Sequence, residues 1–250
     1  MEYGICQLGV IPLRKENSHA SEMTSQLLYG DCYKVLDQQK KWIKIRVTFD
    51  QYEGWIPRTQ FFEIQKDTYE QYQKKRDVFS GHLIDYVTTP QQVLFPILLG
   101  SNLKANALLG NHFDGVRSKN NPKKSDLIQT AFLYLNAPYL WGGKSPFGID
   151  CSGFVQMVYK INGQALKRDA YQQAEQGQTL SFIEESEPGD LAFFDDREGK
   201  IVHVGMLLEN HHIIHAHGKV RIDRIDQTGI FNSETQTHSH QLRIIKKVWG

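Results

Sequence analysis

The sequence predicts an α+β fold, in which a small all-β unit is followed by a unit with separate blocks of helix and antiparallel sheet. Short apolar or alternating runs, separated by turn residues, occupy residues 1–64. From residue 124 onward, apolar residues recur first at helical spacing and then at every second position. These two patterns predict a barrel of short strands and then a helix packed on an antiparallel sheet.

The first unit, residues 1–64, contains enough short strands to need a closed arrangement. A small barrel hides the edges of such strands. Its Pro-Leu-Arg start, Leu-Tyr-Gly-Asp turn, Trp-Ile-Lys-Ile strand and Gly-Trp-Ile-Pro end resemble the bacterial SH3-like domain. The strands are expected at 9–13, 26–30, 33–36 and 42–47, with a closing strand after the turn at 49–54.

Residues 65–123 allow two interpretations, a connector or a reduced second SH3-like unit. The run at 92–100 is strand-like, and Pro96 within it indicates an edge or a bend.

The third part, residues 124–250, is expected to hold two helices and then a sheet. Ser125 is a candidate cap for the first helix, and the second follows Cys151 and ends at Gly163. Alternating segments predict strands at 190–194, 202–208, 213–216, 220–225 and 242–248.

Charge and hydropathy exclude several partners. Lysine and arginine number 29 against 28 aspartate and glutamate, which gives a net charge of +1. This balance, without a long basic run, argues against a nucleic-acid partner. No apolar run reaches the roughly 18 residues of a transmembrane helix, so no membrane partner is expected.

The N-terminus and the cysteines indicate a cytoplasmic protein. The chain starts without a basic segment and apolar signal core, although an exported chain whose leader has been removed would read the same. Its three cysteines lie far apart and form no Cys-x-x-Cys, so neither a disulfide framework nor a zinc site is expected. Cys6 and Cys32 are interpreted as packing residues, and no cofactor or metal is expected.

Cys151 is the candidate nucleophile. It follows a glycine-containing loop, Tyr139 to Gly143, and stands where a helix begins. A helix N-terminus favours a thiolate through its free N–H groups and positive dipole end, and the same N–H groups stabilise an oxyanion. Without its flanking motif, Cys151 would be read as a buried helix cysteine.

Two histidines are candidates for activating the thiol. His203 and His215 lie on neighbouring predicted strands joined by a turn at residues 209–211, which would bring their imidazoles side by side. One ring would then act as the base and the other would hold its tautomer. His217 is the alternative to His215, because it points to the same face two residues along.

At these residues the chain resembles the NlpC-type family of papain-like bacterial peptidases. The run from Tyr139 to Phe154, with His203-Val204-Gly205 and His215-Ala216, carries a resemblance that covers residues 124–250. The resemblance implies Cys151 as nucleophile, His203 as base and His215 as its orienting partner.

One branch of this family joins an SH3-like domain to the catalytic domain. It hydrolyses the bond between γ-D-glutamate and a diamino acid in murein peptides with a free N-terminal L-alanine, which suits cell-wall recycling. Asp169 is a candidate partner for the free amine, and Asp150 is also a candidate helix cap. Ala170 departs from the usual Arg-Asp-Ser. The pocket residues that the resemblance implies are Tyr139, Asp150, Ser152 and the segment Arg168-Asp169-Ala170. Glu22 and Tyr52 of the barrel are candidates to close the far end of this pocket.

Three rival functions and one alternative substrate stay open at this point. The rivals are an inactive binding module, an acyltransferase on the same fold, and a metal site of Cys151 with the histidines, which lack zinc-like spacing. The alternative substrate is polymeric peptidoglycan, cut in wall remodelling. The sequence does not distinguish diaminopimelate from lysine as the diamino acid.

Overall fold

The computed structural model describes residues 2–249 and divides into two compact units. The N-terminal unit comprises the chain up to Asn120 together with Trp141–Pro146, and the C-terminal unit comprises Asn121–Leu140 and the chain from Phe147 onward. The segment Trp141–Pro146 therefore groups with the N-terminal unit, although it lies just before the Asp150-Cys151-Ser152 motif in the sequence.

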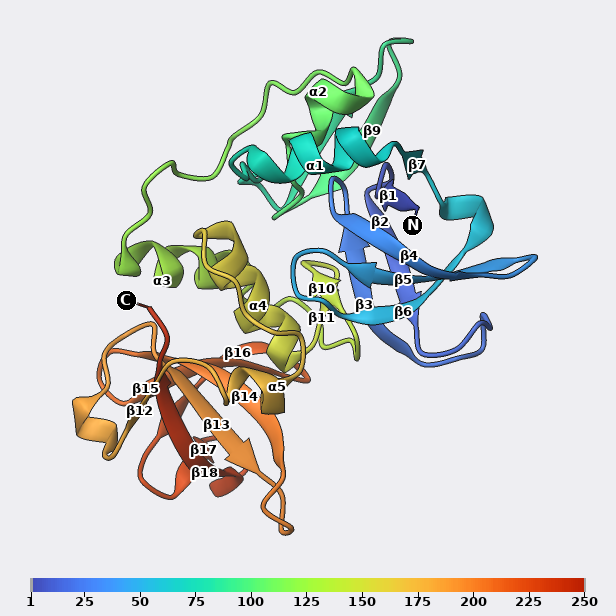
Figure 1. Ribbon diagram of the computed structural model, residues 1–250. Helices are drawn as coiled ribbons and strands as arrows, with labels where there is room; N and C mark the ends of the chain where they lie inside the picture. Colours follow the sequence, from blue (N-terminus) through green and yellow to red (C-terminus); the bar gives the residue numbers. More distant parts are fainter. Residues whose placement is uncertain (1, 250) are drawn as a thin grey trace. The chain divides into compact units, whose positions relative to one another are not determined.

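Seven strands form one curved antiparallel sheet in the N-terminal unit, in the order β3-β2-β6-β5-β4-β1-β7 (Figure 1). Alternate residues of these strands, such as Ile11, Leu13, Ile43 and Ile45, are fully buried and form the barrel core. The strands are β1 (Tyr3–Ile5), β2 (Val10–Arg14), β3 (Met23–Leu28), β4 (Cys32–Gln38), β5 (Trp42–Val47), β6 (Glu53–Pro57) and β7 (Glu63–Ile64).

Residues 65–120 pack onto this barrel through a second core. Tyr69 of α1 stacks on Tyr3 of β1 with ring centroids 4.3 Å apart, and Val87 and Ile97 of the β8–β9 hairpin join the same cluster. Pro96 lies on a strand of a two-stranded sheet, where a missing N–H is tolerated. The elements are α1 (Lys66–Lys74), β8 (Ile84–Thr88), β9 (Leu94–Leu98) and α2 (Ala105–Leu109). The division at 64/65 and 123/124 stays a prediction.

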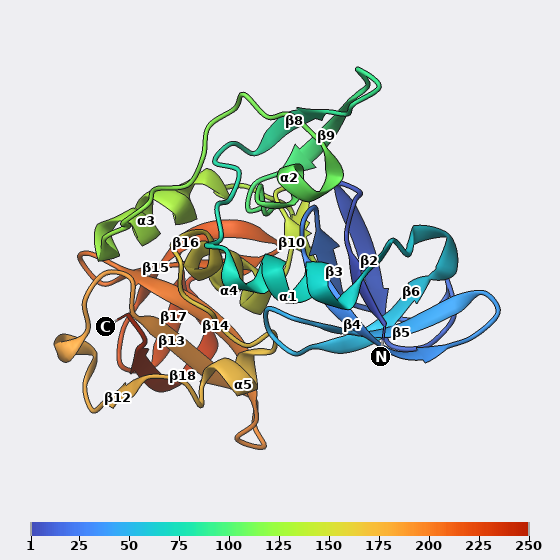
Figure 2. The ribbon, with the colours of Figure 1, turned by 45° about the horizontal axis from the view of Figure 1, so that its top comes forward.

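The C-terminal unit holds a seven-stranded antiparallel sheet in the order β12-β18-β13-β14-β15-β16-β17 (Figure 2). Because β17 also pairs with β18, the strands from β13 to β18 close into a barrel. The strands are β12 (Gln178–Leu180), β13 (Leu191–Asp195), β14 (Ile201–Leu208), β15 (His212–His217), β16 (Lys219–Ile225), β17 (Gly229–Asn232) and β18 (Thr237–Lys247), besides the short β10 (Lys144–Ser145) and β11 (Gly148–Ile149).

Helix α4 (Cys151–Ile161) is buried along its whole length and packs against β14 and β15. Its apolar residues, among them Phe154, Val155 and Val158, are inaccessible to solvent and fill the layer between helix and sheet. The other α-helices described in this unit are α3 (Lys124–Leu133) and α5 (Ala170–Gln173), and residues Ile183–Glu185 form a short 3-10 helix.

The predicted α+β class with an all-β N-terminal barrel is confirmed, and several local details differ. The Ser125 cap is wrong, because α3 begins at Lys124 and the Lys123 N–H donates to Asp126 Oδ2 at 2.7 Å. Strand β17 was not predicted, and neither was the first half of β18, where residues 237–239 are polar and exposed and show no alternation. Between residues 2 and 249, no helix combines the length and apolarity that a bilayer crossing requires.

Candidate active site

Cys151 is the first residue of α4. Asp150 caps this helix, and its Oδ1 accepts the N–H of Gly153 at 2.6 Å. The capped turn leaves the thiol at the positive end of the helix dipole, and only 6% of Cys151 is exposed. The backbone N–H groups of Ser152 and Val204 both face the thiol. Val204 follows His203 on β14, so the helix start lies directly against the histidine strand.

The surroundings of Cys151 favour its protonated form. Burial, followed by the neighbouring Asp150 carboxylate, raises the pKa of the thiol, and the N–H groups of Val204 and Ser152 oppose this rise; the net pKa is about 12. At neutral pH the thiol is therefore neutral in the free protein. A nucleophile in this state needs a base that removes its proton as it attacks.

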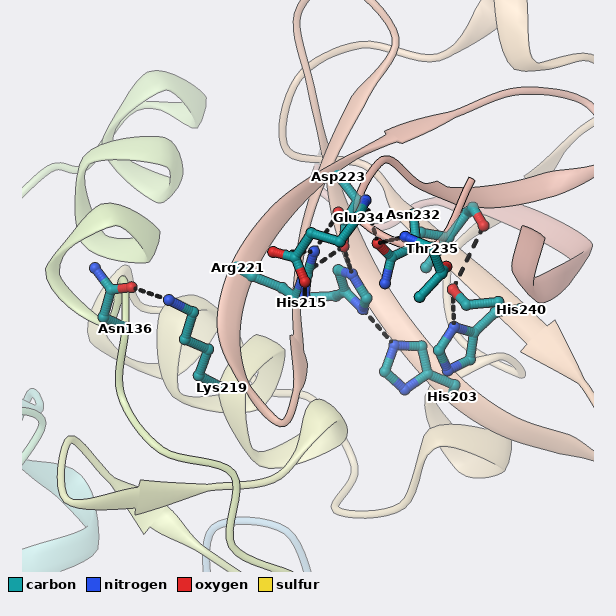
Figure 3. Close-up of polar contacts among 12 residues, drawn as sticks. Asn136, His203, His215, Lys219, Arg221, Asp223, Asn232, Glu234, Thr235 and His240 are labelled. Atoms are coloured by element: carbon teal, nitrogen blue, oxygen red, sulfur yellow. Dashed lines mark hydrogen bonds and ion pairs between the residues drawn. The ribbon is translucent and has the colours of Figure 1, made fainter. Parts of the chain in front are cut away.

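The structure brings His203 and His215 together (Figure 3). His203 Nε2 lies 2.8 Å from His215 Nδ1, and the rings are nearly perpendicular at 85°. In the β14–β15 register Gly205 is opposite His215, so His203 is its diagonal neighbour on the same face. A Cβ on Gly205 would lie 2.9 Å from the Cβ of His215, so this position has room only for glycine.

A carboxylate continues this chain of hydrogen bonds. His215 Nε2 lies 3.0 Å from Asp223 Oδ2 on β16, and both side chains are almost fully buried. Arg221 holds both carboxylate oxygens of Asp223, from Nε at 2.7 Å and from Nη2 at 2.9 Å (Figure 3).

Both histidines are neutral at neutral pH. Burial lowers the pKa of His203 well below its ordinary value, and the neighbouring His215 and His240 lower it further. Burial also lowers the pKa of His215, which Asp223 only partly offsets. Burial alone would raise the pKa of Asp223, but hydrogen bonds from His215 and Arg221 outweigh it and the pKa is lowered. Asp223 is therefore a stable anion at the end of a neutral pair.

Two further histidine rings pack around the pair. His240 of β18 stacks on His203 with ring centroids 4.2 Å apart, and burial lowers its pKa to about 4. His217 stacks on His215 at 6.3 Å and is exposed. The ring that hydrogen-bonds to His203 is thus that of His215, and His217 lies beyond it.

Asp150 and Ser152 share a buried cation. Arg168, which is 1% exposed, donates from Nη2 to Asp150 Oδ2 at 2.6 Å and from Nη1 to Ser152 Oγ at 2.9 Å. Asp169 and Ala170 follow as the cap and first residue of α5, and Ala170 is buried. The half-buried Tyr139 lies near the thiol; burial raises its pKa, and the electrostatic influence of Cys151 once ionised raises it further.

Glu22 and Tyr52 lie in the N-terminal unit. Trp141 Nε1 donates to Glu22 Oε1 at 2.7 Å, and Lys15 pairs with Oε2 at 3.4 Å. The Glu22 side chain is still 40% exposed. Tyr52 is half-buried and packs against the barrel core, so part of its ring has a structural role.

Sequence reasoning missed Asp223, Arg221 and His240. Arg221 and Asp223 are two residues apart on the strand that follows His215 after a tight turn, which is a detectable signal. His240 gives no local signal, because the pairing of β18 with β13 and β17 brings it to the site. Within residues 2–249, no three or more His, Cys, Asp or Glu side chains are arranged to hold a metal ion.

Comparison with known proteins identifies both units. The model of the NlpC/P60 family matches residues 136–239, and that of the bacterial dipeptidyl-peptidase SH3 domain matches residues 13–61. The γ-D-glutamyl-L-lysine dipeptidyl-peptidase of Bacillus subtilis is 30% identical over 77% of this chain and 71% of its own. The Bacillus cereus protein of that name is 29% identical over 80% and 68%.

A solved structure shows the same fold over nearly the whole length. The crystal structure of an NlpC/P60 family protein from Bacillus cereus has a TM-score of 0.79, at 18% identity over 98% of this chain and 99% of that one. These matches support a cysteine peptidase of cell-wall peptides. They confirm the resemblance found in the sequence: the chain belongs to the NlpC/P60 family and carries a bacterial dipeptidyl-peptidase SH3 domain.

Proposed function

We propose that this cysteine peptidase hydrolyses the bond between γ-D-glutamate and the following diamino acid in murein peptides that have a free N-terminal L-alanine. The observation that carries the proposal is Cys151 at the start of α4, facing the backbone of the strand that holds the His203–His215 pair. The names of the Bacillus relatives support the γ-D-glutamyl bond and favour L-lysine as the diamino acid.

The proposed chemistry begins with the neutral thiol. His203 takes the proton of Cys151 while the sulfur attacks the γ-glutamyl carbonyl carbon. The oxyanion forms at the start of α4, where backbone N–H groups stabilise it. His203 then gives its proton to the departing amine, and a thioester stays on Cys151. Water, deprotonated by His203, hydrolyses the thioester and releases the dipeptide.

Substrate binding is assigned to the residues around this centre. Tyr139, Asp150, Ser152, Asp169 and Ala170 are proposed to line the pocket. Because Arg168 neutralises Asp150 from within the protein, we assign the free ammonium to the carboxylates of Asp169 and Glu22 instead. Ala170 contributes no hydroxyl, so any contact of its side chain is apolar.

The N-terminal unit is proposed to restrict the length of the substrate. Glu22, oriented by Trp141 and still accessible, would pair with the ammonium of the L-alanine, and Tyr52 would pack beside it. A peptide that is still attached to muramic acid has no such ammonium. This selectivity suits a cytoplasmic role in recycling of released wall peptides, which we propose over remodelling of the polymer.

The direct test compares L-Ala-γ-D-Glu-L-Lys with the same peptide acetylated at the alanine amine and with the peptide attached to muramic acid, with products identified by mass spectrometry. We expect release of L-Ala-γ-D-Glu from the free peptide, and a kcat/KM lower by tenfold or more for both blocked peptides. Glu22→Gln should lose much of this discrimination. Equal cleavage of all three peptides would refute the length restriction, and no cleavage of any would refute the bond assignment. Comparing kcat/KM for L-Ala-γ-D-Glu-L-Lys with that for the same peptide containing meso-diaminopimelate shows which diamino acid the enzyme prefers.

A further inference from the structure

The hydrogen-bonded chain of the active site extends beyond its second histidine into buried charge. Asp223 accepts from His215 on one side and from Arg221 on the other, and its side chain is 3% exposed. Resting on the proposed function, we infer that Asp223, oriented by Arg221, is a positioning residue that fixes which nitrogen of His203 receives the thiol proton and stabilises the imidazolium that results.

The tautomers follow from the donor and acceptor count. A carboxylate only accepts, so the hydrogen between Asp223 and His215 resides on His215 Nε2. A neutral imidazole carries one N–H, so His215 Nδ1 is an acceptor. The hydrogen of the next bond therefore resides on His203 Nε2, and the lone pair of His203 is left on Nδ1. Asp223 thus makes Nδ1 the basic atom of His203 without contacting it.

Arg221 makes this carboxylate a fixed acceptor. Its guanidinium donates to both oxygens of Asp223, and this planar two-point contact sets the plane of the carboxylate. Arg221 is only 15% exposed and also lies 3.4 Å from Glu234. Asp223 Oδ2 is the oxygen shared between Arg221 Nε and His215 Nε2, so a rotation of the carboxylate would break both bonds.

The charges around His215 explain why Asp223 acts during the reaction. Its titratable and charged neighbours are His203 on β14, His217 on its own strand, Arg221 and Asp223 on β16, and His240 on β18. Of these five, only Asp223 is negative. When His203 gains the thiol proton, the attraction of Asp223 through His215 opposes the burial that disfavours the cation. The interaction strengthens only when charge develops, so it should affect kcat more than KM.

Two substitutions with opposite electrostatic effects test this role. In Asp223→Asn the amide oxygen can still accept from His215, so the tautomer is kept while the charge is lost. We expect kcat to fall on the order of ten- to a hundredfold with KM unchanged. The low-pH side of the kcat/KM profile (the acid limb), where His203 becomes protonated, should move to lower pH by about one unit. Arg221→Gln removes the opposing cation, so its acid limb should move to higher pH. The matched control is Asp226→Asn, which alters an exposed Asp–His pair, Asp226 with His238 at 2.9 Å, and should leave the profile unchanged.

A spectroscopic measurement tests the tautomers without relying on activity. Proton-detected ¹⁵N NMR of histidine-labelled protein should show Nε2–H tautomers for both His203 and His215, and Asp223→Ala should release His215 from its single form. A wild-type His203 protonated at Nδ1, or acid limbs that move in the same direction in the Asp223 and Arg221 variants, would overturn the inference. If Cys151→Ala and His203→Ala are inactive while the Asp223 and Arg221 variants keep the wild-type pH profile of kcat/KM, the inference about Asp223 fails and the proposed function stands. Turnover by Cys151→Ala would instead remove the proposed function.

Discussion

Replacing Arg168 with methionine should destabilise the C-terminal unit strongly. Arg168 is the buried cation between Asp150 and Ser152, with three hydrogen bonds of 2.6–3.0 Å to them. The Asp150 side chain is itself only 7% exposed, so the substitution leaves a buried carboxylate without its cation. Removing one partner of such a pair costs about 3–5 kcal/mol, because the remaining charge loses its compensation.

The free energy of unfolding of this unit can be measured separately from the other. Hydrogen exchange of the α4 backbone amides as a function of urea reports the C-terminal unit alone. The control is Arg243→Met, whose exposed side chain lies 3.6 Å from Asp195; it should change the free energy by less than about 0.5 kcal/mol.

A double variant isolates the physical cause. Asp150→Asn with Arg168→Met removes the buried charge while asparagine keeps the helix cap, so most of the lost stability should return. If Arg168→Met costs less than about 1 kcal/mol, or if the double variant is less stable than the single one, the buried-charge reasoning is refuted.

Three other predictions concern the histidine cluster. Gly205→Ala should fold but lose at least about tenfold in kcat/KM, because its Cβ would displace His215; unchanged kinetics would contradict the tight packing. Burial lowers the pKa values of His203 and His215, so below about pH 6.5 the unfolded state binds more protons than the folded state. The free energy of unfolding should therefore decrease as the pH falls, by up to roughly 2.7 kcal/mol per pH unit for the two histidines together. Equal free energies of unfolding from urea titrations at pH 7, 6 and 5 would refute this prediction. His217→Ala should keep activity within about threefold while His215→Ala loses it, and the reverse result in the same peptide assay would mean that His217 is the orienting residue.

Local patterns predicted the parts of the site that are close in sequence. The loop before Cys151 and the apolar spacing after it predicted a helix start, and Asp150 does cap that helix. The short turn at residues 209–211 predicted neighbouring strands, and the structure pairs them with Gly205 opposite His215. In both cases the deciding interactions lie within about a dozen residues, where spacing and turn chemistry determine the geometry.

The parts that were not predicted depend on contacts between distant segments. The resemblance placed Arg168 in the pocket segment, but its burial and its contact with Asp150 across 18 residues of chain were not predicted. His240 reaches His203 because β18 closes the barrel against β13 and β17. For residues 65–123 the sequence left a connector and a reduced second SH3-like unit open, and it gave no sign that Tyr69, Val87 and Ile97 form a core with Tyr3 of the barrel. No local sequence pattern predicts contacts of this kind between distant segments.

The central claim is that Cys151 is the nucleophile, and turnover of L-Ala-γ-D-Glu-L-Lys by single cysteine variants tests it most directly. The three cysteines are buried and form no disulfide, so each can be replaced by alanine and compared at equal folded concentration, judged by circular dichroism. We expect Cys6→Ala and Cys32→Ala to keep wild-type kcat within about threefold, and Cys151→Ala to lose at least about a thousandfold. A folded Cys151→Ala protein that turns over this peptide within tenfold of wild type would contradict the account.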